Sequence, residues 1–253
     1  MPTQKSKAKS FRSLHVPGKP LILFNAWDAG SAKAVTAAGA AAIATGSWSV
    51  AKANGFDDGE DLPLDLVIAN LARIAKATDL PVTIDLESGY GKTPAAAAKT
   101  VRRSIDAGAV GCNLEDSIPA TGKLRAASDQ AKRIAAVRKA ADATGIAYFI
   151  NARTDVFFQG KRADASLVAE ALKRARLYAD AGADGLFVPG LTDEKLIAKV
   201  CEASPLPVNV MVSQGTPAFK VLAKCGVARI SHGPRPYLLA MKALEDAARA
   251  ATL

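Results

Sequence analysis

Short apolar runs alternate with amphipathic helical stretches along almost all of the 253 residues, and this alternation restricts the fold more than any other feature. The apolar runs are short and continuous, as expected for strands that are covered on both faces. We predict strands at residues 20–24, 40–44, 81–85, 109–114, 147–151, 185–188, 207–211 and 228–231. We predict helices at residues 31–38, 64–77, 94–107, 128–144, 165–181, 193–202, 216–224 and 235–250.

Eight strand–helix pairs in about 230 residues are typical of an α/β fold, the (β/α)8 TIM barrel. Gly39, Gly108, Gly182 and Gly226 stand just before predicted strands, where glycine ends a helix in left-handed geometry. A doubly wound open sheet is the alternative. Its dinucleotide-binding version has no support, because no Gly-x-Gly-x-x-Gly motif follows the first strand.

The ends of the chain differ in character from its middle. We expect residues 1–15 to form a flexible basic N-terminal arm and residues 16–253 to form a single TIM-barrel catalytic domain. The arm lacks the apolar segment of a secretory signal, and no apolar run is long enough to cross a bilayer, so no membrane association is expected. The last helix is amphipathic, which predicts docking on its own barrel or on a neighbouring subunit.

The net charge of +9 favours an anionic substrate. Nucleic acid is not expected as a partner, because the basic residues are scattered and aromatic residues make up only 6% of the chain. Cys112, Cys201 and Cys225 are far apart and lie in apolar contexts. This spacing fits neither a disulfide framework nor a zinc site, and it indicates reduced core cysteines in a cytoplasmic protein.

Two acidic patches follow two consecutive predicted strands. Asp85 is the last residue of the strand at 81–85, and Glu87 stands two residues further on. Glu115 and Asp116 directly follow the strand at 109–114. The carboxyl ends of parallel strands meet at one mouth of a barrel, which is where catalytic groups lie. These acids therefore predict a Mg²⁺ site, with Asp85 as a direct ligand and with Glu87 and Glu115 as ligands directly or through water. The alternative is solvated loop acids or helix N-caps.

Other strand ends carry candidate substrate-binding groups. Arg153 follows the strand at 147–151 and can bind a carboxylate or phosphonate in a forked geometry, or form a structural ion pair with Asp155 or Glu115. The segment Thr45, Gly46, Ser47 and Trp48 offers N–H groups and a hydroxyl to an oxyanion, or forms a plain turn.

The remaining candidates are open to two interpretations each. Asp58, in a long acidic loop, orients the substrate or moves a proton, or else it is simply solvated. Asn209 either contacts the substrate or bonds at the strand end. Trp27 and Trp48 either form the wall of a pocket or cover the barrel core. His232 has no adjacent partner in the sequence, which favours a structural role.

The ordered set of motifs resembles the isocitrate lyase/phosphoenolpyruvate mutase superfamily. The resemblance extends from Phe24 to Leu239 and rests on NAWDAGSA, TGSWSVA, GFDDGEDLP, PVTIDLESGYG, NLEDS, INARTD, AGADGLFVPG, PVNV and GVARISHGP. Members of this superfamily are modified TIM barrels that bind Mg²⁺ and make or break C–C or P–C bonds beside a 2-oxo carboxylate. They commonly form tetramers by packing or exchanging their C-terminal helices, so the resemblance implies a homo-oligomer, a tetramer or a dimer, in which that helix is either packed on its own barrel or swapped between subunits.

The resemblance also implies roles for matching residues. The family's metal-site acids match Asp85, Glu87 and Glu115, with Mn²⁺ as an alternative ion. Its catalytic positions match Asp58, Arg153 and Ser47. Its substrate-binding positions match Trp27, Thr45, Gly46, Ser47, Trp48, Arg153 and Asn209.

Two departures from the family patterns bear on the activity. The lyases of isocitrate and methylisocitrate carry a Lys-Arg-Cys-Gly-His stretch after the fourth strand, whereas this chain reads EDSIPATGKLRAASDQ, without cysteine or histidine. The mutase has a Lys after its Glu-Asp pair, whereas Ser117 stands here. We therefore expect a Mg²⁺-dependent lyase that cleaves a C–C bond beside a 2-oxo carboxylate through a stabilised enolate, as in oxaloacetate decarboxylation. The alternatives are a P–C mutase or hydrolase acting on phosphonopyruvate and a non-catalytic metabolite-binding barrel.

Overall fold

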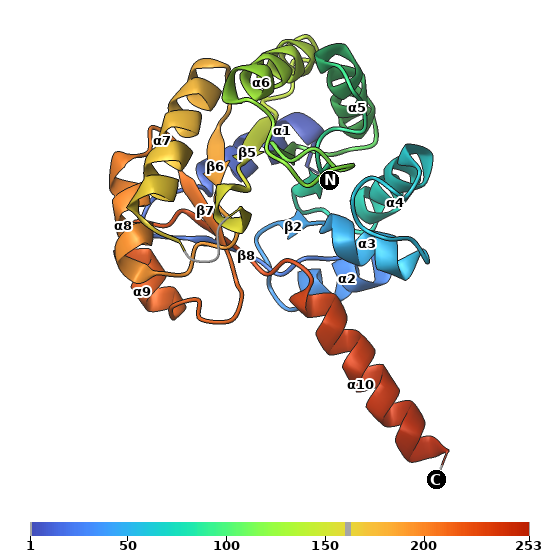
Figure 1. The fold of residues 1–253 in the computed structure, drawn as a ribbon. Helices are drawn as coiled ribbons and strands as arrows, with labels where there is room; N and C mark the ends of the chain where they lie inside the picture. Colours follow the sequence, from blue (N-terminus) through green and yellow to red (C-terminus); the bar gives the residue numbers. More distant parts are fainter. Residues whose placement is uncertain (1, 160–162, 253) are drawn as a thin grey trace.

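The computed structural model describes residues 2–159 and 163–252, in which eight parallel strands form a nearly closed barrel surrounded by helices (Figure 1). The strands pair in the order β1-β8-β7-β6-β5-β4-β3-β2. The open edge between β1 and β2 is bridged just beyond both strands, where Ala26 N donates to Ala44 O at 2.8 Å. The predicted (β/α)8 barrel is confirmed. Its strands are β1 (Leu21–Leu23), β2 (Ile43–Ala44), β3 (Val82–Asp85), β4 (Gly111–Glu115), β5 (Phe149–Arg153), β6 (Gly185–Phe187), β7 (Val208–Met211) and β8 (Arg229–Ser231).

The helices that were predicted between the strands are present, with ends within three residues of the expected positions. Gly39, Gly108, Gly182 and Gly226 have φ angles between +86° and +105°, so the predicted left-handed helix ends are confirmed. Two elements between the strands were not predicted, in addition to the N-terminal helix described below: α3 (Ser47–Ala53) after β2 and the 3₁₀ turn η1 (Val156–Phe158) after β5. The predicted helices are α2 (Ala29–Ala37), α4 (Leu64–Lys76), α5 (Pro94–Asp106), α6 (Ala127–Asp142), α7 (Ala165–Asp180), α8 (Glu194–Ala203), α9 (Phe219–Lys224) and α10 (Arg235–Ala251).

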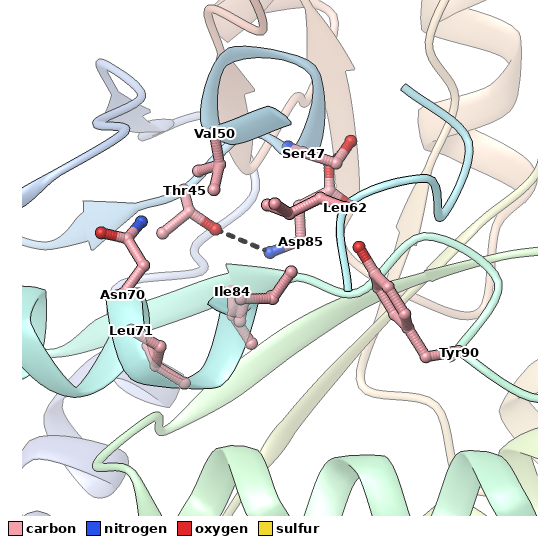
Figure 2. A pocket seen from close by; sticks show the side chains of 10 residues that line it. Thr45, Ser47, Val50, Leu62, Asn70, Leu71, Ile84, Asp85 and Tyr90 are labelled. Carbon is pink, nitrogen blue, oxygen red and sulfur yellow. Dashed lines mark hydrogen bonds between the residues drawn. The ribbon is translucent and has the colours of Figure 1, made fainter. Parts of the chain in front are cut away.

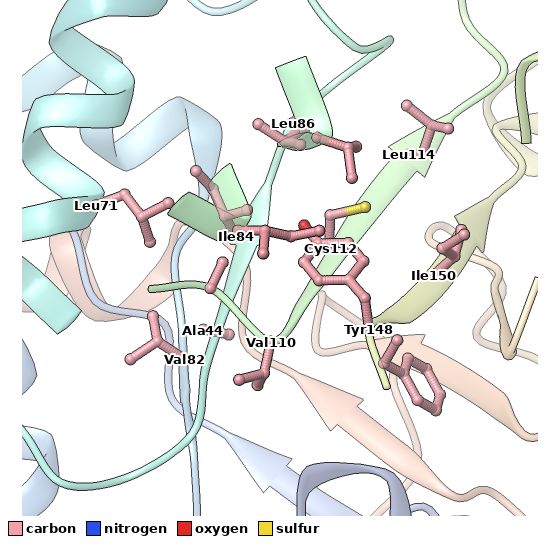
Figure 3. Packing of buried hydrophobic residues seen from close by; sticks show 14 of the residues in the cluster. Ala44, Leu71, Val82, Ile84, Leu86, Val110, Cys112, Leu114, Tyr148 and Ile150 are labelled. Carbon is pink, nitrogen blue, oxygen red and sulfur yellow. The ribbon is translucent and has the colours of Figure 1, made fainter. Parts of the chain in front are cut away.

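The apolar core lies mainly between the strands and the helices. Figure 3 shows Ile84 of β3 and Cys112 and Leu114 of β4 packed together in this layer, and all three are buried. They alternate along their strands with polar residues such as Asp85 and Asn113. Because successive side chains of a strand point to opposite faces, the alternate polar set faces the inside of the barrel. The interior is therefore more polar than the continuous apolar runs suggested.

The N-terminal segment differs from the expected flexible arm. Residues Gln4–Ser13 form helix α1, which closes the end of the barrel where the strands begin. Gln4 Nε2 donates to the carbonyl oxygens of Ile105 and Ala109, and the buried ring of Phe11 packs edge-on against Phe149 at 5.6 Å. The prediction of a solvated arm is wrong for these residues, because one apolar stripe of a basic helix is enough to dock it.

Helix α10 projects away from the barrel (Figure 1). Its apolar side chains Leu238, Leu239 and Leu244 are between 49% and 62% exposed, so it does not dock on its own barrel. Whether it is swapped between subunits remains a prediction. Within residues 2–159 and 163–252, no helix combines the length and the apolar character needed to cross a membrane.

His15 follows α1 and is buried below the strands. Its ring stacks on Phe149 with centroids 3.9 Å apart, and its Nδ1 lies 2.9 Å from the carbonyl oxygen of Phe11. Burial, together with the positive charge of Arg229, lowers the pKa of His15 to about 3. The folded protein therefore keeps His15 neutral at a pH where the unfolded chain, with an ordinary histidine pKa, binds a proton.

We predict that His15 makes the folded state less stable as the pH falls below about 6.5. Between pH 8 and pH 5 the loss attributable to this residue is about 2 kcal/mol. His15→Phe keeps the aromatic packing and removes the titration, so this variant should lose about 2 kcal/mol less than the wild type over the same interval. Denaturant unfolding of both proteins at the two pH values measures the difference. An identical pH dependence in both proteins would contradict the prediction.

Candidate active site

A cavity of about 270 Å³ opens at the carboxyl ends of the strands. Its walls come from the segments that follow β1, β2, β5 and β8, together with residues of the strands themselves. Several residues singled out from the sequence line it, and they include groups of both charges. These are Gly46, Ser47, Trp48, Asp58, Asp85 and Arg153.

Asp85 ends β3 and is held by the segment that follows β2. Ser47 donates to Asp85 Oδ2 from its backbone N at 3.3 Å and from its Oγ at 3.2 Å, and Asp85 N donates to Thr45 Oγ1 at 3.0 Å. Figure 2 shows these three residues beside a small cavity of about 10 Å³, the size of one water molecule. The donors expected to hold a substrate oxyanion are thus directed at the carboxylate of Asp85.

Glu87 follows in a strained turn, with φ at +49°. Its carboxylate accepts hydrogen bonds from Tyr90 OH at 3.0 Å and from the backbone N of Glu60 at 2.7 Å. Glu60 in turn accepts at Oε1 from Ser88 Oγ and from Tyr90 N. These hydrogen bonds join the loop after α3, which carries Glu60, to the turn after β3. Burial, with the nearby charges of Asp58 and Asp85, raises the pKa of Glu87 to about 8.

Glu115 and Arg153 end the neighbouring strands β4 and β5 and form an ion pair. Arg153 Nη1 lies 2.8 Å from Glu115 Oε2, while Arg153 Nε and Nη2 donate to the two oxygens of Asp155 at 2.6 and 3.0 Å. Burial raises the pKa of Glu115 against the opposing effect of Arg153. Burial alone would lower the pKa of Arg153, but Glu115 and Asp155 raise it above its ordinary value. The structural ion pair considered for Arg153 is present, and Arg153 also lines the cavity.

Asp116, the fourth acid of the two patches, points away from the cavity. It is fully buried and accepts from Tyr178 OH at 2.8 Å, from Arg174 Nη1 at 3.0 Å and from Asp155 N at 3.0 Å. Burial raises the pKa of Asp116. This acid therefore holds α7 against the barrel, as expected for the residue that follows an inward-facing Glu115 along a strand.

The expected metal-site acids do not form a ready-made group of direct ligands. Within residues 2–159 and 163–252, no three His, Cys, Asp or Glu side chains converge in a way that could hold an ion. Glu87 is engaged by Glu60 and Tyr90, and Glu115 by Arg153. The donor set nevertheless suits Mg²⁺, which keeps several waters and needs only one or two carboxylates.

The electrostatics of the mouth also favour a cation. After burial, the negative charges of Asp58 and Asp85 raise the pKa of Glu87 further, and those of Asp155, Asp85 and Glu87 raise the pKa of Glu115. The pKa of Asp58 is raised as well, first by burial of its carboxyl group and then by the charge of Asp85. A divalent ion among these carboxylates would relieve the repulsion between them.

Three expected substrate-binding residues do not line the cavity. Thr45 lies behind Asp85 and bonds to its backbone. Trp27 faces an apolar groove on the outside of the barrel, where its ring lies 5.2 Å from that of Tyr237. Asn209 is 1% exposed and lies inside the barrel, bonded to Asn151. The geometry gives no support to direct substrate contact by these residues, whereas Trp48 does line the cavity.

His232 has the structural role that was expected. Its Nδ1 lies 3.1 Å from the carbonyl oxygen of Leu23, and its ring packs near those of Phe24 and Phe219. Burial lowers the pKa of His232.

The sequence interpretation missed two residues that the site brings in. Asn113 lines the cavity and stands two residues before Glu115 in an otherwise apolar run, so the strand period of two could have identified it. Glu60 fastens the loop that carries Asp58. No feature of the sequence distinguishes it from the other acids of that loop.

Comparison with known proteins places the chain in a family. The family model described as phosphoenolpyruvate phosphomutase matches residues 11–252. The 2-methylisocitrate lyase of Escherichia coli is 30% identical over 223 residues, covering 85% of this chain and 73% of that protein. The oxaloacetate decarboxylase of Pseudomonas syringae pv. tomato is 29% identical over 196 residues, covering 74% of this chain and 64% of that one.

A solved structure is closer in sequence. It is the crystal structure of a candidate phosphonomutase from Burkholderia cenocepacia J2315, which is 61% identical and covers 96% of this chain and 99% of its own, with a TM-score of 0.94. The strand-end acids and the barrel described above agree with this relationship. The chain belongs to the phosphoenolpyruvate mutase/isocitrate lyase superfamily.

Proposed function

We propose that this protein is a Mg²⁺-dependent lyase that cleaves a C–C bond beside a 2-oxo carboxylate, with decarboxylation of oxaloacetate as the simplest case. The observation that carries the proposal is the group of mutually repelling carboxylates at the mouth of a cavity of about 270 Å³, a volume that suits a small diacid. The relationship to a 2-methylisocitrate lyase and to an oxaloacetate decarboxylase supports the same class of reaction.

The residues that would hold the cation are Asp85 directly and Glu87 and Glu115 directly or through water, with Mn²⁺ as an alternative ion. The bound ion would act as a Lewis acid on the oxo and carboxylate oxygens of the substrate and so favour the enolate that C–C cleavage leaves. Ser47, which now bonds to Asp85, would keep that carboxylate oriented.

Arg153 and Asp58 would have different roles toward the substrate: Arg153 would bind its carboxylate, and Asp58 would supply a proton. If Glu115 held the cation, the Nη1 donor of Arg153 would become free for the distal carboxylate of the substrate, while Asp155 would still hold the rest of the guanidinium. Decarboxylation breaks the C–C bond, releases CO₂ and leaves an electron pair that must take up a proton at carbon. Asp58, whose pKa is raised by burial and by Asp85, is the cavity residue we assign to deliver that proton.

A second candidate is P–C bond chemistry on phosphonopyruvate, as a mutase or a hydrolase. The specific observations in its favour are the match to the phosphoenolpyruvate phosphomutase model and the 61% identity to a candidate phosphonomutase. The same cation and cavity would serve either reaction. The third reading, a barrel that binds a metabolite without catalysis, rests on the missing cysteine and histidine of the loop after β4.

We also propose that the protein is a homo-oligomer. Helix α10 leaves Leu239 and Leu244 exposed, and the outward-facing side chains Ile22 and Phe24 of the β1 region are 36% and 40% exposed. An apolar groove between α2 and the start of α10 adjoins this uncovered surface. A second copy that supplies its α10 to this surface would cover both sets of side chains.

Purified protein with Mg²⁺ and oxaloacetate should release pyruvate faster than Mg²⁺ alone, because the cavity fixes the dicarboxylate beside the cation. Coupled reduction of pyruvate measures the rate, and phosphorus NMR with phosphonopyruvate tests the second candidate in parallel. Formation or loss of a P–C bond, without pyruvate release from oxaloacetate, would replace the lyase by the mutase or hydrolase. No turnover of any 2-oxo acid or phosphonate would reject both enzymes.

Asp85→Ala should abolish the Mg²⁺-dependent activity, a loss of at least about 100-fold, while the unfolding transition stays close to that of the wild type. The matched control is Asp57→Ala, since Asp57 lies 82% exposed in the loop after α3 and pairs with Lys52. The control should keep wild-type activity. Full activity in Asp85→Ala would show that the metal assignment is wrong.

Leu239→Glu should shift the protein from an oligomer to a monomer in analytical ultracentrifugation, because it places a charge in the surface we expect to be buried. The control is Lys242→Glu, which changes the charge of an exposed residue on the same helix. A wild-type protein that sediments as a monomer would contradict the proposed oligomer.

A further inference from the structure

A network of buried polar side chains fills the barrel directly below the cavity. Its members come from β4, β5, β7 and β8, and each is at most 5% exposed. Two of them, Asn113 and Ser231, also line the cavity. The complete set is Asn113, Asn151, Asn209, Arg229 and Ser231.

Arg229 fixes the orientation of the Asn113 amide. A guanidinium has only donors, so the Asn113 atom that lies 3.2 Å from Arg229 Nη2 must be the oxygen Oδ1. The same oxygen accepts a second hydrogen bond from Asn151 Nδ2 at 2.9 Å. The Nδ2 group of Asn113 is therefore turned away from both donors, and the residues that the structure describes supply it with no acceptor.

The other end of the network is fixed independently. Asn209 Nδ2 donates to the carbonyl oxygens of Val210 at 2.8 Å and of Arg229 at 3.2 Å, which can only accept. Asn209 Oδ1 must then face Asn151, whose Nδ2 donates to it at 3.1 Å. A flip of any one amide would set donor against donor or acceptor against acceptor, so the N–H groups of Asn113 are held in place.

Arg229 also gives the floor of the cavity a positive charge. Among the described residues no carboxylate lies within ion-pair distance of it, in contrast to Arg153, which has two. Burial lowers the pKa of Arg229 to about 9, against the opposing effect of Asp85, so the side chain is still a cation at neutral pH. A buried cation without a counter-ion is costly, and an anion above it would offset part of that cost.

We infer that Asn113 donates a hydrogen bond from Nδ2 to a carboxylate oxygen of the bound substrate, and that Arg229 and Asn151 are positioning residues that hold this donor in place. The chemical class of the ligand, a small carboxylate, rests on the proposed function. The geometry of the Asn113 donor and the positive charge of Arg229 do not depend on the proposed function. The site then separates its two tasks: the acids at the rim receive the cation, and the floor receives the anion.

The experiment measures oxalate binding by calorimetry at saturating Mg²⁺, in the wild type and in two variants. Asn113→Ala removes the donor without adding charge or bulk, and oxalate should bind at least about 10-fold more weakly. Asn113→Asp keeps the shape and the acceptor for Arg229 and Asn151 but sets a negative charge against the ligand, so the loss should be larger, about 100-fold or more. Mg²⁺ affinity without oxalate should stay within about twofold of the wild type in Asn113→Ala.

A purely structural role for Asn113 predicts a different result. Asn113→Asp would then bind oxalate as the wild type does, because the contacts with Arg229 and Asn151 are kept, and that outcome would overturn the inference. So would a wild-type protein that binds no oxalate at millimolar concentration. Should Asn113→Asp fail to fold, Asn113→Ala decides the question alone. Weakened oxalate binding in a protein that turns over no 2-oxo acid would leave the inference standing and reject the proposed lyase.

Discussion

Everything in this site depends on the register between the parallel strands β3, β4 and β5. Asp85 of β3 pairs with Asn113 of β4, and Glu115 of β4 pairs with Arg153 of β5, so two successive rows of inward-facing positions carry these four polar groups to the same mouth. A shift of one residue would turn each of them into the apolar layer under the helices. The packing of Ile84, Cys112 and Leu114 in that layer therefore fixes the position of the acids as firmly as their own hydrogen bonds do.

The charges are arranged in layers along the barrel axis. Carboxylates gather at the rim, where burial and then their mutual repulsion raise the pKa values of Glu87 and Glu115, while Arg229 lies below them without a carboxylate partner among the described residues. Arg153 lies at the rim beside its register partner Glu115, and Glu115 and Asp155 neutralise its charge. Such an arrangement suits the successive entry of a cation and an anion, because each neutralises a charge that the protein alone leaves unbalanced.

The sequence predicted the strands, the barrel and the position of Asp85, since these follow from where apolar runs begin and end. It could not predict which partners the strand-end side chains would take. Arg153 is paired with two acids, and Trp27 faces an outer groove, because residues distant in the sequence come close only in the folded barrel. The docking of α1 was missed for the same reason: a few buried contacts, chiefly that of Phe11 with Phe149, outweigh the basic character of the segment.

The central claim is that the acids at the mouth hold a divalent cation, with Asp85 as its direct ligand. Anomalous diffraction from crystals soaked in Mn²⁺ tests it most directly, since Mn²⁺ replaces Mg²⁺ at oxygen sites and is visible above the protein atoms. The account predicts one strong anomalous peak within bonding distance of Asp85 and within water-mediated reach of Glu87 and Glu115. Crystals that show no peak at the mouth, or a peak only at another place on the protein, would contradict it.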